Sequence, residues 1–211
     1  MKKLFLIPGL GADASIFADY DFTGFQKVVI KWSESFENES LSSYARKLMS
    51  QIDDDSPIII GFSFGGMIAV EIAKEIHDSK VCLVSSISSY RQISWFKRFP
   101  AASGLIRLVP DWFLTKPNAF LFWLFGVNDP NSKTKLSEII KNTSPEFLKW
   151  AVGAIGIWKG SSNHSALYRI HGSSDRLLPL KGNADQIMEG GGHFMVVDKR
   201  EEIEKLLLSF I

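Results

Sequence analysis

Five short apolar runs alternate with helical patterns along this chain, and the alternation restricts its fold more than any other feature. Each run is brief and consists largely of Val, Ile and Leu, which is typical of strands buried on both faces of a parallel sheet. The predicted strands are Leu4–Ile7, Val28–Ile30, Ile58–Ile60, Val81–Val84 and Leu167–Ile170. Strands that alternate with helices indicate an α/β fold with a largely parallel sheet.

The segments between the runs carry apolar residues at helical spacing. One predicted helix follows the N-cap candidate Ser40, and a second, Met67–Ile76, is apolar at all but three positions. Ser144-Pro145 opens another helix with proline at its first position, and Glu201–Phe210 closes the chain. Because 211 residues suffice for one large core but leave little room for a second, we expect a single domain over 1–211.

Residues 90–144 interrupt the alternation. This segment has no clear strand, carries 10 of the 26 aromatic residues, and has eight basic against three acidic side chains, a net charge of +5. We interpret it as a helical cap inserted after the strand that ends near Val84, with most aromatics in ordinary packing and a minority lining a substrate cavity. A solvated helix face explains the basic excess better than a site for an anionic substrate.

A G-x-S-x-G motif joins the predicted strand Ile58–Ile60 to the helix after it. The motif reads Gly61-Phe62-Ser63-Phe64-Gly65 and is followed by another glycine. A serine at the tip of such a strand–turn–helix elbow has a strained backbone that exposes its hydroxyl, and only glycine fits two positions to either side. Ser63 is therefore the predicted nucleophile.

A serine hydroxyl needs a general base, and the chain has four histidines. His193 follows three glycines near the C-terminal end, in a loop that allows its imidazole to reach Ser63, and we predict that it is the base. His77 fits a surface position, His164 a solvated polar loop, and His171 a structural place at the end of a strand.

A carboxylate must orient the base. Asp175 comes shortly after the strand Leu167–Ile170, and the carboxyl ends of parallel strands are where α/β active sites assemble. We therefore predict Asp175 as the acid. Of its rivals, Asp185 has no predicted strand directly before it, and Asp198 is expected to cap the last helix.

Two backbone amides complete the predicted site. The first strand ends in Pro8-Gly9-Leu10-Gly11, where glycines let main-chain N–H groups approach a bound carbonyl. The helix after Ser63 points unpaired N–H groups at the same place. The amides of Leu10 and Phe64 are the predicted donors of an oxyanion hole.

These motifs, in this order, resemble the α/β-hydrolase superfamily, and in particular its esterase- and lipase-like serine hydrolases. The resemblance covers nearly the whole chain apart from 90–144 and rests on four stretches: Pro8–Gly11, Gly61–Gly66, His171–Pro179 and Gly192–Met195. It implies an ester, thioester or amide hydrolase. Two departures stand out: many members have His-Gly where this chain has Pro8-Gly9, and the early first strand implies a sheet trimmed to about six strands.

The predicted function is hydrolysis of a small or medium acyl ester or thioester through an acyl-enzyme intermediate. Ser63 would attack the carbonyl, His193 would take its proton, and Asp175 would orient His193. We expect a small-molecule acyl substrate, no cofactor and no metal. Neither Asp53-Asp54-Asp55 nor any Cys/His spacing fits a metal site.

Three alternatives stay open at the level of sequence. The chain could be a non-catalytic small-molecule binding protein on the same fold, or an acyltransferase that uses an alcohol or amine in place of water. The third alternative is a dinucleotide-binding protein, because Gly9-Leu10-Gly11-Ala12-Asp13-Ala14 fits G-x-G-x-x-A and Glu34 lies where a ribose-binding acid would be expected.

Composition excludes some classes of protein. Lys and Arg number 24 against 23 Asp and Glu, so the basic excess of a general nucleic-acid-binding protein is missing. The longest apolar run, Ala119–Val127, is too short to cross a bilayer as a helix, and we expect no stable membrane insertion. Pro8 breaks the N-terminal apolar stretch before it reaches signal-peptide length, and the single Cys82 allows no internal disulfide, so we expect a cytoplasmic protein.

Overall fold

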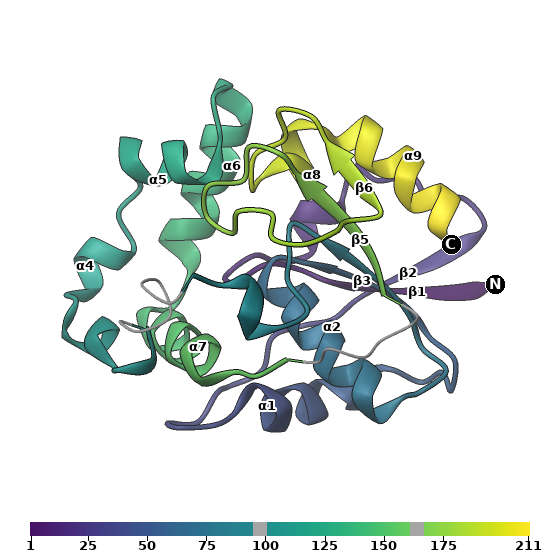
Figure 1. Cartoon of the computed structure of the whole chain (residues 1–211), viewed down its shortest axis with the longest axis horizontal. Coiled ribbons are helices and arrows are strands. Elements are labelled where there is room, and N and C mark those ends of the chain that lie inside the picture. Colours follow the sequence, from purple (N-terminus) through teal and green to yellow (C-terminus); the bar gives the residue numbers. More distant parts are fainter. Residues whose placement is uncertain (95–100, 161–166) are drawn as a thin grey trace.

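One six-stranded sheet forms the centre of the molecule, in a computed structural model that describes residues 1–94, 101–160 and 167–211. The strand order is β2-β1-β3-β4-β5-β6, and every neighbouring pair is parallel (Figure 1). The strands are β1 (Lys2–Ile7), β2 (Phe25–Val29), β3 (Ile58–Phe62), β4 (Lys80–Val84), β5 (Leu167–Gly172) and β6 (Gln186–Met188). The predicted parallel α/β sheet of about six strands is confirmed.

The sheet register brings the carboxyl ends of β1, β3 and β4 together. Ile7 pairs with Gly61, and Phe62 pairs with Val84. The loop after β1 and the turn after β3 therefore adjoin at one edge, which is where ligands bind in open α/β sheets.

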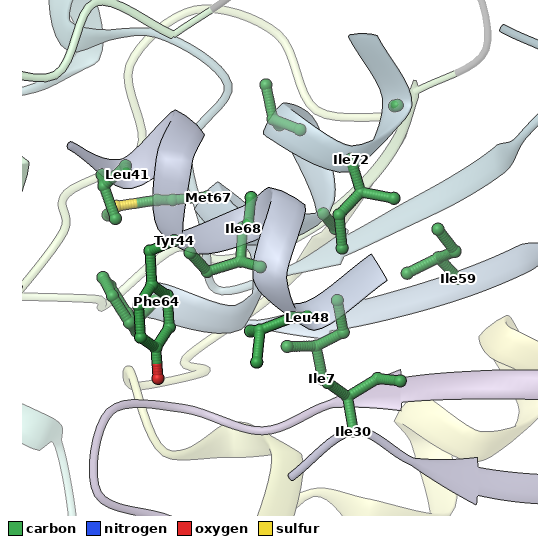
Figure 2. Close-up of a cluster of buried hydrophobic side chains, with 14 of the residues drawn as sticks. Ile7, Ile30, Leu41, Tyr44, Leu48, Ile59, Phe64, Met67, Ile68 and Ile72 are labelled. Carbon is green, nitrogen blue, oxygen red and sulfur yellow. The ribbon is translucent and has the colours of Figure 1, made fainter. Parts of the chain in front are cut away.

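One face of the sheet is covered by α1 (Leu41–Leu48), α2 (Phe64–Glu75) and α7 (Pro145–Ile157). Because side chains alternate along a strand, Phe5 and Ile7 of β1 pack on this face, together with Ile59 of β3. Figure 2 shows how Ile7 and Ile59 meet side chains of α1 and α2. The predicted N-cap is present: the Ser40 hydroxyl accepts from an amide in the first turn of α1. The Ser144 hydroxyl does the same for α7.

The opposite face packs against α8 (Met195–Asp198) and α9 (Arg200–Phe210). Leu4 and Leu6, the residues of β1 that alternate with Phe5 and Ile7, are fully buried there with Ile203 and Leu207 of α9. Strands apolar on both faces are what a sheet between two helical layers requires. The predicted strands are apolar on both faces because a separate hydrophobic core lies on each side of the sheet.

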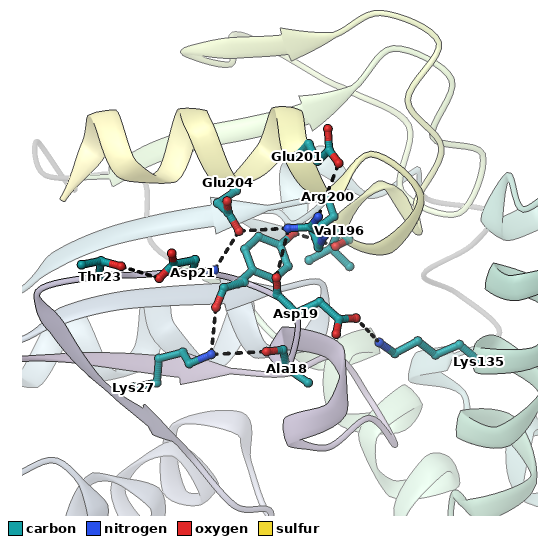
Figure 3. Close-up of polar contacts among 11 residues, drawn as sticks. Ala18, Asp19, Asp21, Thr23, Lys27, Lys135, Val196, Arg200, Glu201 and Glu204 are labelled. Carbon is teal, nitrogen blue, oxygen red and sulfur yellow. Dashed lines mark hydrogen bonds and ion pairs between the residues drawn. The ribbon is translucent and has the colours of Figure 1, made fainter.

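Polar contacts fix α8 and α9 against the connection between β1 and β2 (Figure 3). The Tyr20 hydroxyl donates to the Val196 carbonyl at 2.6 Å, and Arg200 Nη1 donates to the Asp19 carbonyl at 3.0 Å. Burial raises the pKa of the Tyr20 hydroxyl well above its usual range, so it stays a donor at neutral pH. The segment that carries His193 is therefore anchored on its C-terminal side.

Helices also follow β4, in the segment that the sequence predicts as a cap. Its described part contains η3 (Tyr90–Gln92), η4 (Leu105–Leu108), α4 (Asp111–Leu114), α5 (Ala119–Phe125) and α6 (Pro130–Asn142). Figure 1 shows α4 and α5 at the end of the molecule opposite to the two termini. In the described ranges no helix is long and apolar enough to cross a bilayer. The bounds 90–144 for the cap stay a prediction.

The structure differs from the sequence analysis at two places, the start of the last helix and the last strand. Asp198 does not cap the last helix, so that prediction is wrong: α8 leads into α9 through Lys199 alone, and the Lys199 amide donates to Met195 while its carbonyl accepts from Ile203. This near-continuous helix leaves the start of α9 with no need for a side-chain cap. The short strand β6 escaped the sequence pattern because it has only three residues, of which two are exposed.

Candidate active site

Ser63 occupies a strained turn between β3 and α2. Its backbone has φ 53° and ψ −118°, a conformation that non-glycine residues rarely adopt. The Ser63 amide donates to the Val84 carbonyl at 2.9 Å, while its carbonyl accepts from the Gly66 amide at 3.0 Å and the Ser86 hydroxyl at 2.5 Å. These hydrogen bonds hold the turn in the strained conformation, in which the Ser63 hydroxyl lies within hydrogen-bonding distance of His193.

The glycines of the elbow are there because backbone atoms come close to them. A Cβ atom on Gly65 would lie 2.3 Å from the carbonyl oxygens of Ile7 and Pro8, and one on Gly61 would lie 2.6 Å from the carbonyl oxygen of Gly65. No flexible side chain can yield at these contacts. The structure therefore agrees with the steric argument made from the sequence, that only glycine fits at positions 61 and 65.

His193 lies between Ser63 and Asp175. Its Nε2 is 2.8 Å from Ser63 Oγ, and its Nδ1 is 2.8 Å from Asp175 Oδ2. All three residues come from the carboxyl side of the sheet: Ser63 follows β3, Asp175 follows β5, and His193 follows β6. The structure thus brings together the three side chains that the sequence predicts as nucleophile, base and acid.

The direction of these hydrogen bonds follows from the carboxylate. Burial by itself would raise the pKa of Asp175, but the facing His193, hydrogen bonds from His171 and His193, and the Leu178 amide together hold it well below its usual value. An ionised carboxylate can only accept, so Nδ1 of His193 carries the proton. Its Nε2 is then free to accept from the Ser63 hydroxyl, which is the arrangement a general base requires.

The His193 imidazole is fully buried among aromatic rings. The rings of Phe62 and Phe125 have centroids 5.6 and 5.4 Å from that of His193. The Phe194 amide donates to the Phe125 carbonyl at 3.1 Å, so the loop of His193 is bonded to the end of α5. Helix α5 therefore takes part in fixing the histidine.

His171 has a contact that the sequence did not indicate. Its Nε2 lies 2.7 Å from the Leu178 carbonyl oxygen and 3.4 Å from Asp175 Oδ2. A carbonyl only accepts, so Nε2 of His171 carries the proton and also faces the carboxylate. With the Leu178 amide on Asp175 Oδ1 at 2.8 Å, His171 orients the acid. The sequence predicted a structural role for His171 but not its partner. The spacing of four residues between His171 and Asp175 was the one sequence feature that could have indicated this contact.

The other histidine and aspartate candidates lie elsewhere. His77 is exposed just after α2, as expected, and His164 lies outside the described residues. Asp185 is exposed and accepts from the Arg169 amide at 2.7 Å, which ties it to β5. Asp198 is part of α8.

A cavity of about 300 Å³ opens at Ser63, and Leu10 and Phe64 both line it. Phe64 is the first residue of α2, so its amide is one of the N–H groups that the helix itself leaves unpaired. These positions are where the two predicted oxyanion donors are needed. Their role as donors stays a prediction.

Apart from Ser63 and Thr143, the cavity is lined by apolar side chains and one glycine. Thr143 Oγ1 donates to the Ile139 carbonyl at 2.6 Å, so its hydroxyl is already engaged. The lining comes from the sheet side and from α4, α5, α6 and α7: Gly9, Leu10, Ala12, Ile16, Phe62, Phe64, Met67, Leu114, Leu121, Leu124, Phe125, Leu136, Ile139, Ile140, Leu148, Val152, Ile155, Leu177, Leu178 and Phe194. A binding space of this kind suits a hydrocarbon group and offers no partner for a charge.

The loop after β1 does not fit the dinucleotide alternative. The chain forms only the short 3₁₀ turn η1 (Ala14–Phe17) there, whereas a pyrophosphate site needs the N-terminus of an α-helix. A Cβ atom on Gly11 would lie 1.8 Å from Thr143 Oγ1, so a side chain of the helical segment fills the approach to this glycine.

The model of the α/β-hydrolase family matches residues 4–206, nearly the whole chain. The chain belongs to the α/β-hydrolase family. No protein with a curated description matches it.

This α/β-hydrolase is similar to several solved structures at low sequence identity. An esterase from Exiguobacterium antarcticum is 15% identical with a TM-score of 0.75, over 100% of this chain and 91% of that one. A thermophilic esterase from Thermogutta terrifontis is 14% identical with a TM-score of 0.74, over 98% and 88%. A bromoperoxidase from Bacillus anthracis is 15% identical with a TM-score of 0.67, over 99% and 91%. At such identities the likeness shows the fold alone.

The elbow contacts predict a large steric effect at one glycine and none at another. Gly65→Ala is expected to lower the free energy of unfolding by about 3 kcal/mol, because its Cβ meets main-chain oxygens. Gly153→Ala, in α7 with open space around its Cβ, is expected to raise it by about 0.5–1 kcal/mol. Urea unfolding followed by circular dichroism measures both, and equal stabilities would contradict the account of the elbow.

The contacts of His171 predict different effects of two substitutions. His171→Leu removes the N–H that serves Leu178 and Asp175, so we expect a loss of about 1–3 kcal/mol in the free energy of unfolding. His171→Gln keeps a donor near the position of Nε2 and is expected to recover most of that loss. The same unfolding measurement compares the two variants, and a Gln variant no more stable than the Leu variant would show that the hydrogen bond has no role.

Proposed function

We propose that this α/β-hydrolase is a serine hydrolase that cleaves a small or medium acyl ester or thioester. The observation that carries the proposal is the continuous chain of hydrogen bonds from Ser63 through His193 to Asp175, at 2.8 Å each, beside an apolar cavity. A nucleophile, a base and an orienting carboxylate within hydrogen-bonding distance are the parts that acyl transfer to serine requires.

The reaction proceeds in two halves. As Ser63 Oγ attacks the substrate carbonyl, His193 Nε2 takes its proton and then gives it to the leaving alcohol or thiol, which leaves an acyl group on Ser63. A water molecule then attacks the acyl carbon while His193 accepts its proton. His193 gives that proton to Ser63 Oγ as the bond from Oγ to the acyl carbon breaks, and the acid is released. Asp175 stays ionised throughout, and its negative charge stabilises the imidazolium that forms twice in each cycle.

The amides of Leu10 and Phe64 hold the oxyanion that forms in both halves. The start of α2 supports this role, because the partial positive charge at a helix N-terminus favours a negative charge nearby. One such preorganised donor contributes about 3–4 kcal/mol to the stabilisation of the transition state. Since the donors are main-chain groups, Pro8-Gly9 in place of His-Gly leaves this function intact.

The cavity restricts the acyl group of the substrate. Neither of its two polar side chains offers a charge, and one is Ser63 itself. A cavity of about 150 Å³ holds a benzene-sized group. A volume of about 300 Å³ therefore suits an uncharged chain of roughly eight to twelve carbon atoms. The net charge of +5 on residues 90–144 finds no counterpart in this lining, which supports a solvated face rather than a site for an anionic acyl end.

A small-molecule acyl substrate is accordingly the partner we propose. We also propose a cytoplasmic location, because a chain with the single Cys82 gains nothing from an oxidising compartment.

Covalent labelling with a fluorophosphonate, followed by mass spectrometry of the peptides, tests the proposed nucleophile. We expect one label on Ser63, none in Ser63→Ala, and a rate at least about a hundredfold lower in His193→Ala, since the base is then missing. Circular dichroism serves as the control for folding. A folded wild-type chain that takes no label would favour the non-catalytic alternative.

Esters of increasing chain length test the proposed acyl site. We expect kcat/KM for p-nitrophenyl esters to rise with chain length to roughly eight to twelve carbons and then fall, because longer chains exceed the cavity. Val152→Phe, which fills space in the lining, is expected to move the optimum to shorter chains. An optimum that Val152→Phe leaves unchanged would place the acyl chain outside this cavity.

A further inference from the structure

Large apolar side chains are exposed in one short part of the cap segment. In the described part of the chain eleven large apolar residues are exposed, and six of them fall within residues 105–123, with 50–79% of their surface accessible. We refer to these six as the cap patch: Leu105, Leu108, Trp112, Phe113, Phe120 and Trp123. Patches of this kind on a protein surface mark an interaction site.

Helix α5 shows how unusual the cap patch is. All of its residues, Ala119–Phe125, are apolar or aromatic, so it has no polar face for water. Leu121 and Leu124 line the cavity at Ser63, whereas Phe120 and Trp123 point outward with their rings stacked 5.9 Å apart. A helix that is apolar all round is normally buried in protein or in lipid. Within the part of the chain that the structure describes, the outer face of α5 therefore has no partner.

The charges around the cap patch are positive or neutralised. Asp111, the single acid in 105–123, is paired with Lys149 at 2.6 Å. Lys116 is exposed between α4 and α5, and the guanidinium of Arg176 lies 4.9 Å from the ring centre of Trp123. Exposed Trp, Phe and Leu among cations are the composition of segments that lie in the interface of anionic membranes.

We propose that the cap patch binds to the surface of anionic lipid bilayers. The aromatic side chains of α4 and α5 enter the headgroup region, and the surrounding cations contact lipid phosphates. Charge favours this partner over a second copy of the chain, because two cap segments of net charge +5 would repel each other. Figure 1 shows α4 and α5 along one edge of the molecule, so both can meet a flat surface together.

Bilayer binding does not depend on the proposed hydrolysis, but it would have a consequence for it. The helices that carry the cap patch also provide Leu114, Leu121 and Leu124 to the cavity lining. Docking of α4 and α5 would therefore bring the acyl site to the lipid surface, where apolar esters are concentrated.

Co-sedimentation of the full chain with vesicles tests the proposal. We expect binding to vesicles of phosphatidylglycerol and phosphatidylcholine in equal parts, and much weaker binding to phosphatidylcholine alone. Phe120→Ser/Trp123→Ser is expected to weaken binding roughly tenfold or more, and Lys116→Glu roughly fivefold or more. Leu208→Ser, an exposed apolar position on α9 at the other end of the molecule, is the matched control and should bind as the wild type does.

Several results would overturn the proposal. Equal binding to both kinds of vesicle would remove the role of charge, and full binding by the double variant would remove the role of the cap patch. Light scattering that shows a dimer, lost in the double variant, would assign the patch to a second copy of the chain. Fluorophosphonate labelling of Ser63 in the same samples keeps a failure of lipid binding separate from a failure of the proposed hydrolase.

Discussion

The close approach of α2 to the carboxyl end of β1 is the constraint on which the site depends. Gly65 is pressed against the main-chain oxygens of Ile7 and Pro8, and this contact fixes where α2 begins and where Ser63 turns. The positive φ of Ser63 costs free energy that hydrogen bonds from Gly66 and Ser86 help to offset. Serine, the loop after β1 and the start of α2 are thereby held together before any substrate arrives.

The second element of the account is the environment of the histidine. His193 comes from a glycine-rich loop, yet it is fully buried, because the end of α5 bonds to the loop and the ring of Phe125 packs beside the imidazole. The same helix, with α4, α6 and α7, also lines the apolar cavity at Ser63. The cavity lining and the position of His193 thus both depend on α5, which would link binding of the proposed acyl chain to the proposed chemistry.

The sequence predicts the sheet from its apolar runs. It also singles out the three side chains that the structure brings together, from local patterns such as a glycine-flanked serine and a histidine after glycines. What it misses depends on distant contacts. β6 is too short and too exposed to show a pattern, Asp198 loses its capping role because α8 continues into α9, and the contact of His171 with Asp175 requires the loop to fold back on itself. The outward face of α5 was visible as an apolar run but not as an exposed one.

The central claim is that Ser63, activated by His193, carries the acyl group. Rapid acid quenching of the full chain during turnover of p-nitrophenyl hexanoate, followed by mass spectrometry, tests it most directly. The account predicts a hexanoyl adduct on Ser63 and loss of turnover in Ser63→Ala. Undiminished turnover in a folded Ser63→Ala variant, or an adduct on another side chain, would contradict it.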